Sequence, residues 1–406
     1  MSRFSWQQIF ITGIFTFLVI LSACSSNKRD RFQPTETIMP DPEIPTVVPP
    51  TDTPLPTNTT TPEPTTPLTA TVWEQDPITV VLTYHQFAAN IAKQSTGLKV
   101  RFEDFEQQLN QLYDAGFSLV RLEDWLSGQI IVPAGRRPLI LSFDDLYFNN
   151  QIRLDAETRE PIAESGLGIL WRFYQDHPDF GYSAALFINL GDKLYGNPDD
   201  PDWEMQLAET IAWGIDHDLV PYNHFFTHPK LDITSAPAIL WELEMNDKYL
   251  RELLTMAGRE DLIPGLENMI ALTYGVWPAR GDTKAMLAYK NPEGKPVRLV
   301  AEIDTIFLEK YLPAPYDPSF DPFHFPRHVA SPEGVDFLVN QADKIPAAAI
   351  CNLGNVPDAL FGNPQNLAAY IAQAAGRNGC PDGVYVTAGL LVRVTSGQGE
   401  LIVLSD

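Results

Sequence analysis

The feature that most constrains this chain is its alternation of short apolar, β-branched runs with segments of helical periodicity. The pattern begins with an apolar run at residues 77–87. Apolar residues then recur at helical spacing from Phe102 until Gly116 ends the segment. Further apolar runs lie at 137–145, 182–190, 219–228, 268–278 and 295–303, with a short one near 118. Strands that alternate with helices form parallel sheets from βαβ units, so the sequence predicts either a barrel or a doubly wound sheet.

Polar residues follow several of the predicted strands. Four such groups stand at strand ends: His85, Asp144–Asp145, His224 with His228, and Tyr274–Gly275. In barrels and in doubly wound sheets, functional side chains gather at the carboxyl ends of the strands. One polar group at such a position is unremarkable, whereas four at equivalent positions predict a functional site.

The residue types in these groups suit a catalytic metal. Asp144 and Asp145 are adjacent, so their side chains point to different sides and are free to take different roles. An isolated Asp-Asp step is more often an acidic turn or a helix N-cap. His224 and His228 are four residues apart, a spacing that grips zinc in a helix or tight turn, although a surface pair is the alternative. One Asp and two His leave a fourth position open for water, and the second Asp is placed to act as a general base.

In order and approximate spacing, these motifs resemble the polysaccharide deacetylases of the NodB-homology type, carbohydrate esterase family 4. The resemblance covers residues 77–329. The matching segments are Thr83-Tyr84-His85, Ser142-Phe143-Asp144-Asp145-Leu146 for T-F-D-D-G, Asn223-His224-Phe225-Phe226-Thr227-His228-Pro229 for N-H-T-x-[ST]-H-P, and Tyr274-Gly275 at the end of R-x-P-Y-G. The fold implied is an α/β distorted barrel of about seven parallel strands, with a small C-terminal appendage here.

The resemblance also implies a role for each matched residue. Asp144 resembles the catalytic base. Asp145, His224 and His228 resemble the ligands of a divalent metal, with zinc expected first and cobalt or a similar ion as the alternative. The backbone N–H of Tyr274 resembles an oxyanion donor, placed to meet charge that develops on the substrate's amide oxygen.

Three departures from the family pattern bear on the chemistry. Leu146 replaces the glycine after the two acids, and Phe225 replaces a hydroxyl residue after the first histidine. Ala271 stands where the family has an arginine that pairs with the base. Arg280 and Arg327 are the substitutes available, and "FDPFHFPRH" at 320–328 is similar to a late Pro-Arg motif of exported members, which favours Arg327.

The family's late Leu-x-His motif is not found. His328 and His324 are the nearest candidates for a general acid, and the alternative is that both are loop histidines. His85 either lines the pocket or packs beneath it. Trp277 either forms one wall of a sugar platform or belongs to the core.

The N-terminus predicts export and lipid anchoring. Arg3 precedes an apolar run at 9–21, and the small residues before Cys24 complete a segment that resembles a bacterial lipobox. This implies cleavage before Cys24 and lipidation of its sulfur; an ordinary signal anchor or a plain secreted protein is the alternative. A Pro/Thr-rich stretch follows, which has almost no large apolar residues and predicts an extended, solvated spacer.

Charge and cysteine usage narrow the partners and the compartment. The formal net charge of −24 argues against nucleic acid as a partner and disfavours a polyanionic substrate. Besides Cys24, only Cys351 and Cys380 are present. Export makes a disulfide between them plausible, with two buried free thiols as the alternative.

Together these observations predict four segments. They are a signal peptide at 1–23, a disordered linker at 24–70, the barrel at 71–343 and an extension at 344–406 that ends in a hairpin. The predicted function is metal-dependent removal of N-acetyl groups from a cell-surface or extracellular polysaccharide. Two alternatives stay open: a hydrolase of another amide or ester, and a non-catalytic carbohydrate-binding lipoprotein on the same fold. The sequence does not predict the glycan, the oligomeric state or which bacterial membrane holds the anchor.

Overall fold

The computed structural model describes residues 64–91, 95–96, 98–192, 200–304 and 311–404. The predicted signal peptide, the lipidation site Cys24 and most of the predicted linker lie outside these residues. Within the described part of the chain, no helix is both long enough and apolar enough to cross a membrane.

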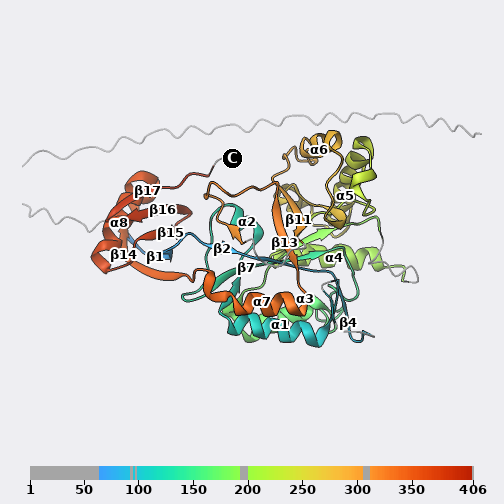
Figure 1. Cartoon of the computed structure of the whole chain (residues 1–406), viewed down its shortest axis with the longest axis horizontal. Coiled ribbons are helices and arrows are strands. Elements are labelled where there is room, and N and C mark those ends of the chain that lie inside the picture. The colour runs from blue at the N-terminus through green and yellow to red at the C-terminus, as the bar shows by residue number, and fades with distance from the viewer. Residues whose placement is uncertain (1–63, 92–94, 97, 193–199, 305–310, 405–406) are drawn as a thin grey trace, which may run out of the picture. The chain divides into compact units, whose positions relative to one another are not determined.

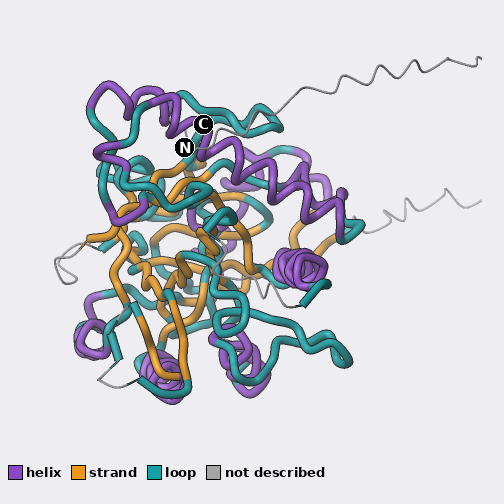
Figure 2. Tube along the Cα trace, turned by 90° about the vertical axis from the view of Figure 1, so that its right-hand side faces the viewer, coloured by secondary structure: helices purple, strands orange, loops and turns teal. Residues whose placement is uncertain are grey.

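Seven parallel strands close into a barrel with helices around it, which confirms the predicted fold class. In order around the ring the strands are β3 (Val81–Tyr84), β13 (Phe325–Val329), β11 (Leu299–Asp304), β10 (Met269–Ala271), β9 (Leu219–Asn223), β8 (Ala184–Ile188) and β7 (Arg137–Asp144). Pairing of β3 with β7 closes the ring. Figure 2 shows the strands gathered inside the surrounding helices.

Alternate residues of each barrel strand face opposite sides, and both sides are buried. Val81 and Ile140 belong to the apolar cluster inside the barrel. Their neighbours Leu82 and Leu141 belong to the cluster beneath the helices. Burial on both faces explains why the strands read as continuous apolar runs rather than as an alternation of polar and apolar residues.

The helices are α1 (Phe102–Asp114), α2 (Leu122–Leu126), α3 (Gly166–Asp176), α4 (Trp203–Asp216), α5 (Ala236–Met256), α6 (Arg280–Leu287) and α7 (Pro332–Asn340). Helix α1 buries Phe105, Leu109 and Leu112 on one face, as its spacing predicts. Gly116 follows it at φ +83°, a left-handed conformation that glycine adopts without steric cost.

Two strands differ from expectation. We predicted no strand at 320–328, yet β13 lies there between β11 and β3. Proline and charged residues are rare in buried strands, so Pro326 and Arg327 hide the strand pattern. The short strand predicted near 118 is β6 (Phe117–Leu119), which pairs only with the start of β7 and lies outside the ring.

A separate antiparallel sheet is built from both ends of the described chain (Figure 1). In order its strands are β14 (Ala349–Pro357), β1 (Thr65–Trp73), β15 (Gly383–Thr387), β16 (Leu390–Thr395) and β17 (Gln398–Leu401), packed against α8 (Pro364–Asn378). The predicted terminal hairpin is β16 with β17. We expected the linker to extend to residue 70, but β1 begins at Thr65. A threonine-rich segment is able to form a strand once β14 and β15 supply partners on both sides.

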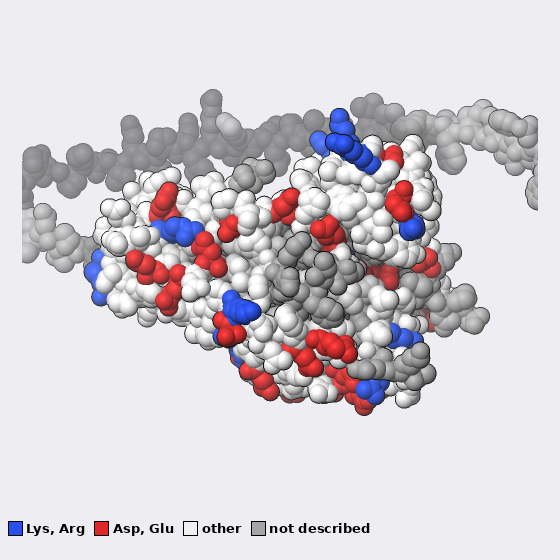
Figure 3. All heavy atoms as spheres, in the orientation of Figure 1, with Lys and Arg blue, Asp and Glu red and all other residues white. Residues whose placement is uncertain are grey.

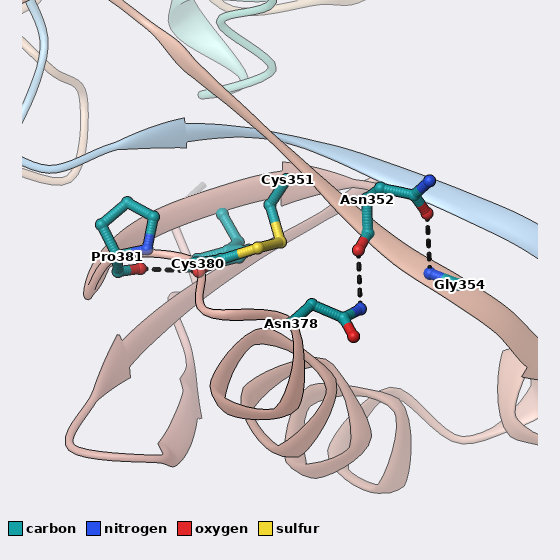
Figure 4. Close-up of a disulfide and its surroundings, with 7 residues drawn as sticks. Cys351, Asn352, Gly354, Asn378, Cys380 and Pro381 are labelled. Atoms are coloured by element: carbon teal, nitrogen blue, oxygen red, sulfur yellow. Dashed lines mark hydrogen bonds between the residues drawn. A yellow bond between two sulfur atoms is a disulfide. The ribbon is translucent and has the colours of Figure 1, made fainter.

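A disulfide joins β14 to the second residue after α8. Cys351 and Cys380 are bonded across a sequence separation of 29 residues (Figure 4), which confirms the predicted bridge. Asn378 adds a hydrogen bond of 2.7 Å from its amide to the Asn352 carbonyl. A structural disulfide is typical of proteins that fold outside the cytoplasm.

Short strands complete the described structure, and the extra sheet contacts the barrel. The short strands are β2 (Ile78–Thr79) with β12 (Leu312–Pro313), and β4 (Gln86–Ala88) with β5 (Lys99–Arg101). Trp73 in β1 is fully buried and donates its indole N–H to the Ile130 carbonyl over 3.0 Å. Val384 and Leu391 belong to the same apolar cluster as the barrel interior.

Candidate metal centre

The predicted site residues stand at the carboxyl ends of neighbouring strands. Asp144 is the last residue of β7 and Asp145 follows it, while His224 follows the last residue of β9. Counting in steps of two from the interior residues Ile140 and Val220 reaches Asp144 and His224, so both side chains start on the barrel's inner side.

Asp145, His224 and His228 form one cluster. One ligand atom from each lies within 4.8 Å of the others. The Asp145 carboxylate is 3.6 Å from Nε2 of His228 and 3.9 Å from Nε2 of His224. Two imidazoles and a carboxylate form a donor set that is found in catalytic zinc sites. Asp145 and His224 are largely shielded from solvent, with exposed fractions of 8% and 2%. The residues present therefore fit a divalent metal.

Neighbouring groups orient these ligands. Nδ1 of His224 lies 2.9 Å from the Ala271 carbonyl, and since a carbonyl only accepts, Nδ1 carries the proton. This tautomer leaves the lone pair on Nε2, which faces Asp145. The amide of Asn189, which is 1% exposed, donates to Oδ1 of Asp145 over 3.1 Å. Partners of this kind hold metal ligands in place before the metal arrives.

Burial dominates the electrostatics of the cluster. It lowers the pKa of His224 to about 3, so the imidazole is neutral at physiological pH, which is the form that binds metal. Burial and then the neighbouring charge of Asp144 raise the pKa of Asp145 to about 6. Two adjacent carboxylates in a buried site thus concentrate negative charge where a cation would be stabilised.

Asp144 has a partner of its own, Arg327. The guanidinium, which is fully buried on β13, forms a two-pronged ion pair with the carboxylate, and Nη2 donates to Oδ2 over 2.9 Å. Burial alone would raise the pKa of Asp144, but Arg327, with smaller contributions from His224 and His85, outweighs burial and lowers it to about 2. Of the two candidates named from the sequence, Arg327 meets the acid, whereas Arg280 is exposed at the start of α6.

The three other histidines considered from the sequence differ in whether they reach the candidate metal site. His85 reaches the site, with Nε2 3.9 Å from Asp144. His328 directly follows Arg327 in β13, so its side chain starts on the opposite face of the strand. His324 precedes the strand and lies 3.5 Å from Glu302 with its ring against Trp277. Neither late histidine is brought to the metal cluster.

Tyr274 lies at the rim of the site. Its backbone has φ 56° and ψ 11°, within a short 3-10 turn at Thr273–Gly275 after β10. The ring is 64% exposed and packs edge-on against His228, with 4.5 Å between the ring centres. The N–H proposed as an oxyanion donor therefore belongs to a turn beside a candidate metal ligand.

Backbone strain gathers at the same place. Asp145, Phe225, His228 and Tyr274 are all non-glycine residues with φ between 53° and 61°. Such conformations cost of order 1–3 kcal/mol each and cluster at functional sites. Leu146, which replaces the motif glycine, is buried and has no positive φ, because the left-handed turn falls one residue earlier. The loss of that glycine is thus tolerated.

Three polar residues on α5 support the site and were missed in the sequence. Glu242 accepts from both the N–H and the hydroxyl of Thr227, each over 2.6 Å, inside the His224–His228 loop. Asn246 binds the backbone on both sides of Asn189. Asp247 accepts from the amide of Asn223 over 3.1 Å. Their signal was present, because all three are polar residues on the apolar face of an amphipathic helix.

We expect Glu242→Gln to weaken metal binding by about 10- to 100-fold, the range for loss of an outer partner. The amide offers Thr227 only one acceptor in place of two, so the loop that carries His228 is held less firmly. Zinc affinity measured by competition with a chelator checks this. Glu244→Gln, an exposed glutamate on the same helix, is the matched control. Equal zinc affinities in the two variants would contradict a role for Glu242.

Comparison with known proteins gives only distant likenesses. No protein-family model and no curated protein matches the sequence. Among solved structures the chain is similar to the Streptococcus pyogenes deacetylase PplD in complex with acetate, at 16% identity and a TM-score of 0.42, over 65% of this chain and 98% of that one. It is similar to IcaB from Ammonifex degensii at 17% identity and a TM-score of 0.42, over 66% and 98% of the two chains. A polysaccharide deacetylase from Bacillus cereus matches at 18% identity and a TM-score of 0.43, over 66% and 69%.

Proposed function

We propose that this protein is a metal-dependent hydrolase that removes N-acetyl groups from a cell-surface or extracellular polysaccharide. The observation that carries the proposal is that a candidate metal site and an ionised carboxylate lie side by side at the carboxyl ends of the barrel strands. Asp145 and His224, both buried, and the half-buried His228 form a donor set for a divalent metal, and Asp144 lies beside them, ionised and held by Arg327. Metal-dependent hydrolysis uses a bound metal and a proton acceptor side by side.

The metal supplies Lewis-acid chemistry when bound, polarising a carbonyl and lowering the pKa of water. Asp144 accepts the proton of the attacking water, and Arg327 fixes the direction of its carboxylate. The N–H of Tyr274 faces the negative charge that develops on the amide oxygen. His85, 3.9 Å from Asp144, replaces His328 as our candidate to protonate the leaving amine, because His328 starts on the other face of β13.

The surface supports a neutral rather than a polyanionic substrate. Acidic side chains outnumber basic ones on the face shown in Figure 3, in keeping with the net charge of −24. A polyanion would be repelled from such a surface. An N-acetylated neutral glycan meets no such barrier, and the exposed ring of Tyr274 offers its sugar an apolar face at the rim.

Acetate release from purified protein tests the proposal. The substrates are N-acetylglucosamine oligomers and peptidoglycan, with an O-acetylated sugar as the ester comparison, in zinc or cobalt. We expect metal-dependent release from an N-acetylated glycan, reduced about 100-fold or more in His85→Gln and little changed in His328→Gln. Release from the ester alone would favour a different hydrolase. Glycan binding without release from any substrate would favour a carbohydrate-binding protein.

We further propose that the protein is exported and anchored through a lipid on Cys24. The segment before Cys24 supports this, as does the disulfide, which suits an oxidising compartment. Metabolic labelling with palmitate in a bacterial host checks the anchor. We expect label in the wild-type chain and none in Cys24→Ser; equal labelling of both would overturn the anchor.

A further inference from the structure

A cavity lies away from the candidate metal centre, at the ends of β8 and β9 where the strands enter the barrel. It has a volume of about 550 Å³. Gly181 to Ser183 and Asp216 to Asp218, which line it, precede these two strands directly. Asp145 and His224 follow the exit ends of β7 and β9. The two sites therefore open at opposite ends of the barrel.

The strand pairing explains why a cavity forms there. Along one edge of β7, residues 137–139 pair with β6 and residues 142–144 pair with β8. The wall therefore passes from β6 to β8 partway along β7. Leu119 at the end of β6 meets Gly181 ahead of β8, where an added Cβ would lie 3.3 Å from the Leu119 carbonyl. The chain beyond each of these points diverges and lines the cavity.

One wall of the cavity is aromatic. Trp171 and Tyr174 on α3 and Tyr182 ahead of β8 line it, with 4.9 Å between the ring centres of Trp171 and Tyr182 and 5.7 Å between those of Trp171 and Tyr174. His217 on the same lining lies edge-on to Trp171 at 5.5 Å. Packed rings with one side open to a cavity suit the C–H face of a sugar and also attract cations.

Of the three aspartates that line the cavity, two are paired with arginines and one is not, within the part of the chain that the structure describes. Arg121 pairs with Asp218 over 3.1 Å, and Asp216 pairs with Arg259 over 2.6 Å. Asp124, which is half-buried in α2, has no hydrogen bond or ion pair through its carboxylate among the described residues. Burial raises the pKa of Asp124, with Arg121 acting in the opposite direction, so solvent does not fully stabilise its charge. A cationic group entering the cavity would give Asp124 a partner.

We propose that this cavity binds a sugar bearing a free amine, as found in an N-deacetylated glycan. The aromatic wall takes the sugar's C–H face, Asp124 pairs with its ammonium group, and Gln129 and Ser183 face its hydroxyls. The inference rests on the proposed function, because an amine-bearing glycan is the product of deacetylation. The site would hold the protein on glycan that it has already processed, while the metal centre at the other end acts on acetylated sugar.

Isothermal titration of the full chain tests the proposal with a glucosamine tetramer and an N-acetylglucosamine tetramer. The titrations are run on His228→Ala, so that turnover does not change the ligand. We expect Asp124→Asn, introduced into the His228→Ala protein, to weaken binding of the amine-bearing tetramer by roughly tenfold or more. The reason is that a hydrogen bond to a charged group is lost. Tyr174→Ala should weaken the binding of either tetramer in this cavity, because it removes part of the aromatic wall. Asp114→Asn, which removes an exposed carboxylate on α1, is the control and should change neither.

Three results would overturn the proposal. The first is that the amine-bearing tetramer does not bind, and the second is that its binding is unchanged by Asp124→Asn and Tyr174→Ala. The third is that lysine binds as tightly as the tetramer, which would make the cavity a general cation site. Its failure is distinct from failure of the proposed function. Acetate release without Asp124-dependent binding removes only the second site, and Asp124-dependent binding without acetate release removes only the deacetylase.

Discussion

His228→Ala is expected to abolish metal-dependent acetate release and to lose the bound metal. The wild-type chain should hold one zinc or cobalt ion per molecule. Removing one of three ligands should weaken affinity by more than about 100-fold, the upper end of the effect of losing an outer partner. Metal content by mass spectrometry and acetate release by the same preparations are the two measurements. Adding a chelator to the wild-type protein should reproduce the variant, and returning zinc should reverse it.

Stability gives a readout of the same site that does not depend on activity. A ligand present at 1,000 times its Kd stabilises the folded state by about 4 kcal/mol. Zinc should therefore raise the unfolding midpoint of the wild-type protein and leave that of His228→Ala nearly unchanged. His324→Ala, an exposed histidine outside the cluster, should respond to zinc as the wild type does. Full metal content in both His228→Ala and Asp145→Asn would contradict the centre described above.

Arg327→Met is expected to destabilise the protein by about 3–5 kcal/mol, because it leaves Asp144 as an uncompensated buried charge. Both partners are at most 1% exposed, so water cannot replace the lost arginine. Chemical denaturation at neutral pH measures the loss. Arg159→Met, which breaks an exposed pair with Glu209, should cost no more than about 1 kcal/mol and serves as the control.

The pH dependence of this loss has a defined sign. In the wild type the pKa of Asp144 is lowered to about 2, so the pair stabilises the folded state above the unfolded pKa of about 3.9 and the effect fades only as pH falls toward 2. Without Arg327, burial raises the pKa of Asp144 instead, and protonation then relieves the folded state. The difference between wild type and variant should shrink as pH falls from 7 toward 5.

A double variant separates the buried charge from other effects of Arg327→Met. Asp144→Asn with Arg327→Met removes both charges and should recover most of the lost stability without recovering activity. Replacing a buried pair with uncharged residues is often close to neutral, whereas removing one partner is not. A double variant as unstable as Arg327→Met alone would show that packing against Phe187, 4.7 Å from the guanidinium, outweighs the charge.

Some parts of this protein could be predicted because their determinants lie close together in the chain. Asp144 and Asp145 are adjacent, and His224 and His228 are four apart, so a short segment carries the chemistry and its spacing. The buried parallel strands could be predicted because they read as continuous apolar runs, since burial on both faces acts on every residue of a strand. Those runs left a barrel and a doubly wound sheet open, and only the family resemblance favoured the barrel. The terminal hairpin followed from two runs around a glycine turn, for the same local reason.

Other parts depend on residues that meet only after folding. β1 pairs with β14, which lies far away in the sequence, and no local pattern in a Pro/Thr-rich segment indicates that partner. The sequence of α5 shows helical periodicity, but it does not indicate which loops Glu242 and Asn246 contact in the folded protein. The cavity at the entry ends of β8 and β9 exists because β7 exchanges one neighbour for another partway along its length, which is a property of the closed sheet.

By itself, then, the sequence determined the strand–helix order, the residues of the candidate metal site and the arginine that pairs with Asp144. The tertiary structure alone decided which of His85 and His328 reaches the site. His85 and His328 both lie in or next to barrel strands, and both are at most 9% exposed. The direction of each side chain follows from its position in the strand's alternation, and the residue that it meets follows from the neighbouring strand. That pairing is set by closure of the barrel, a long-range event that the amino acids near each histidine do not encode.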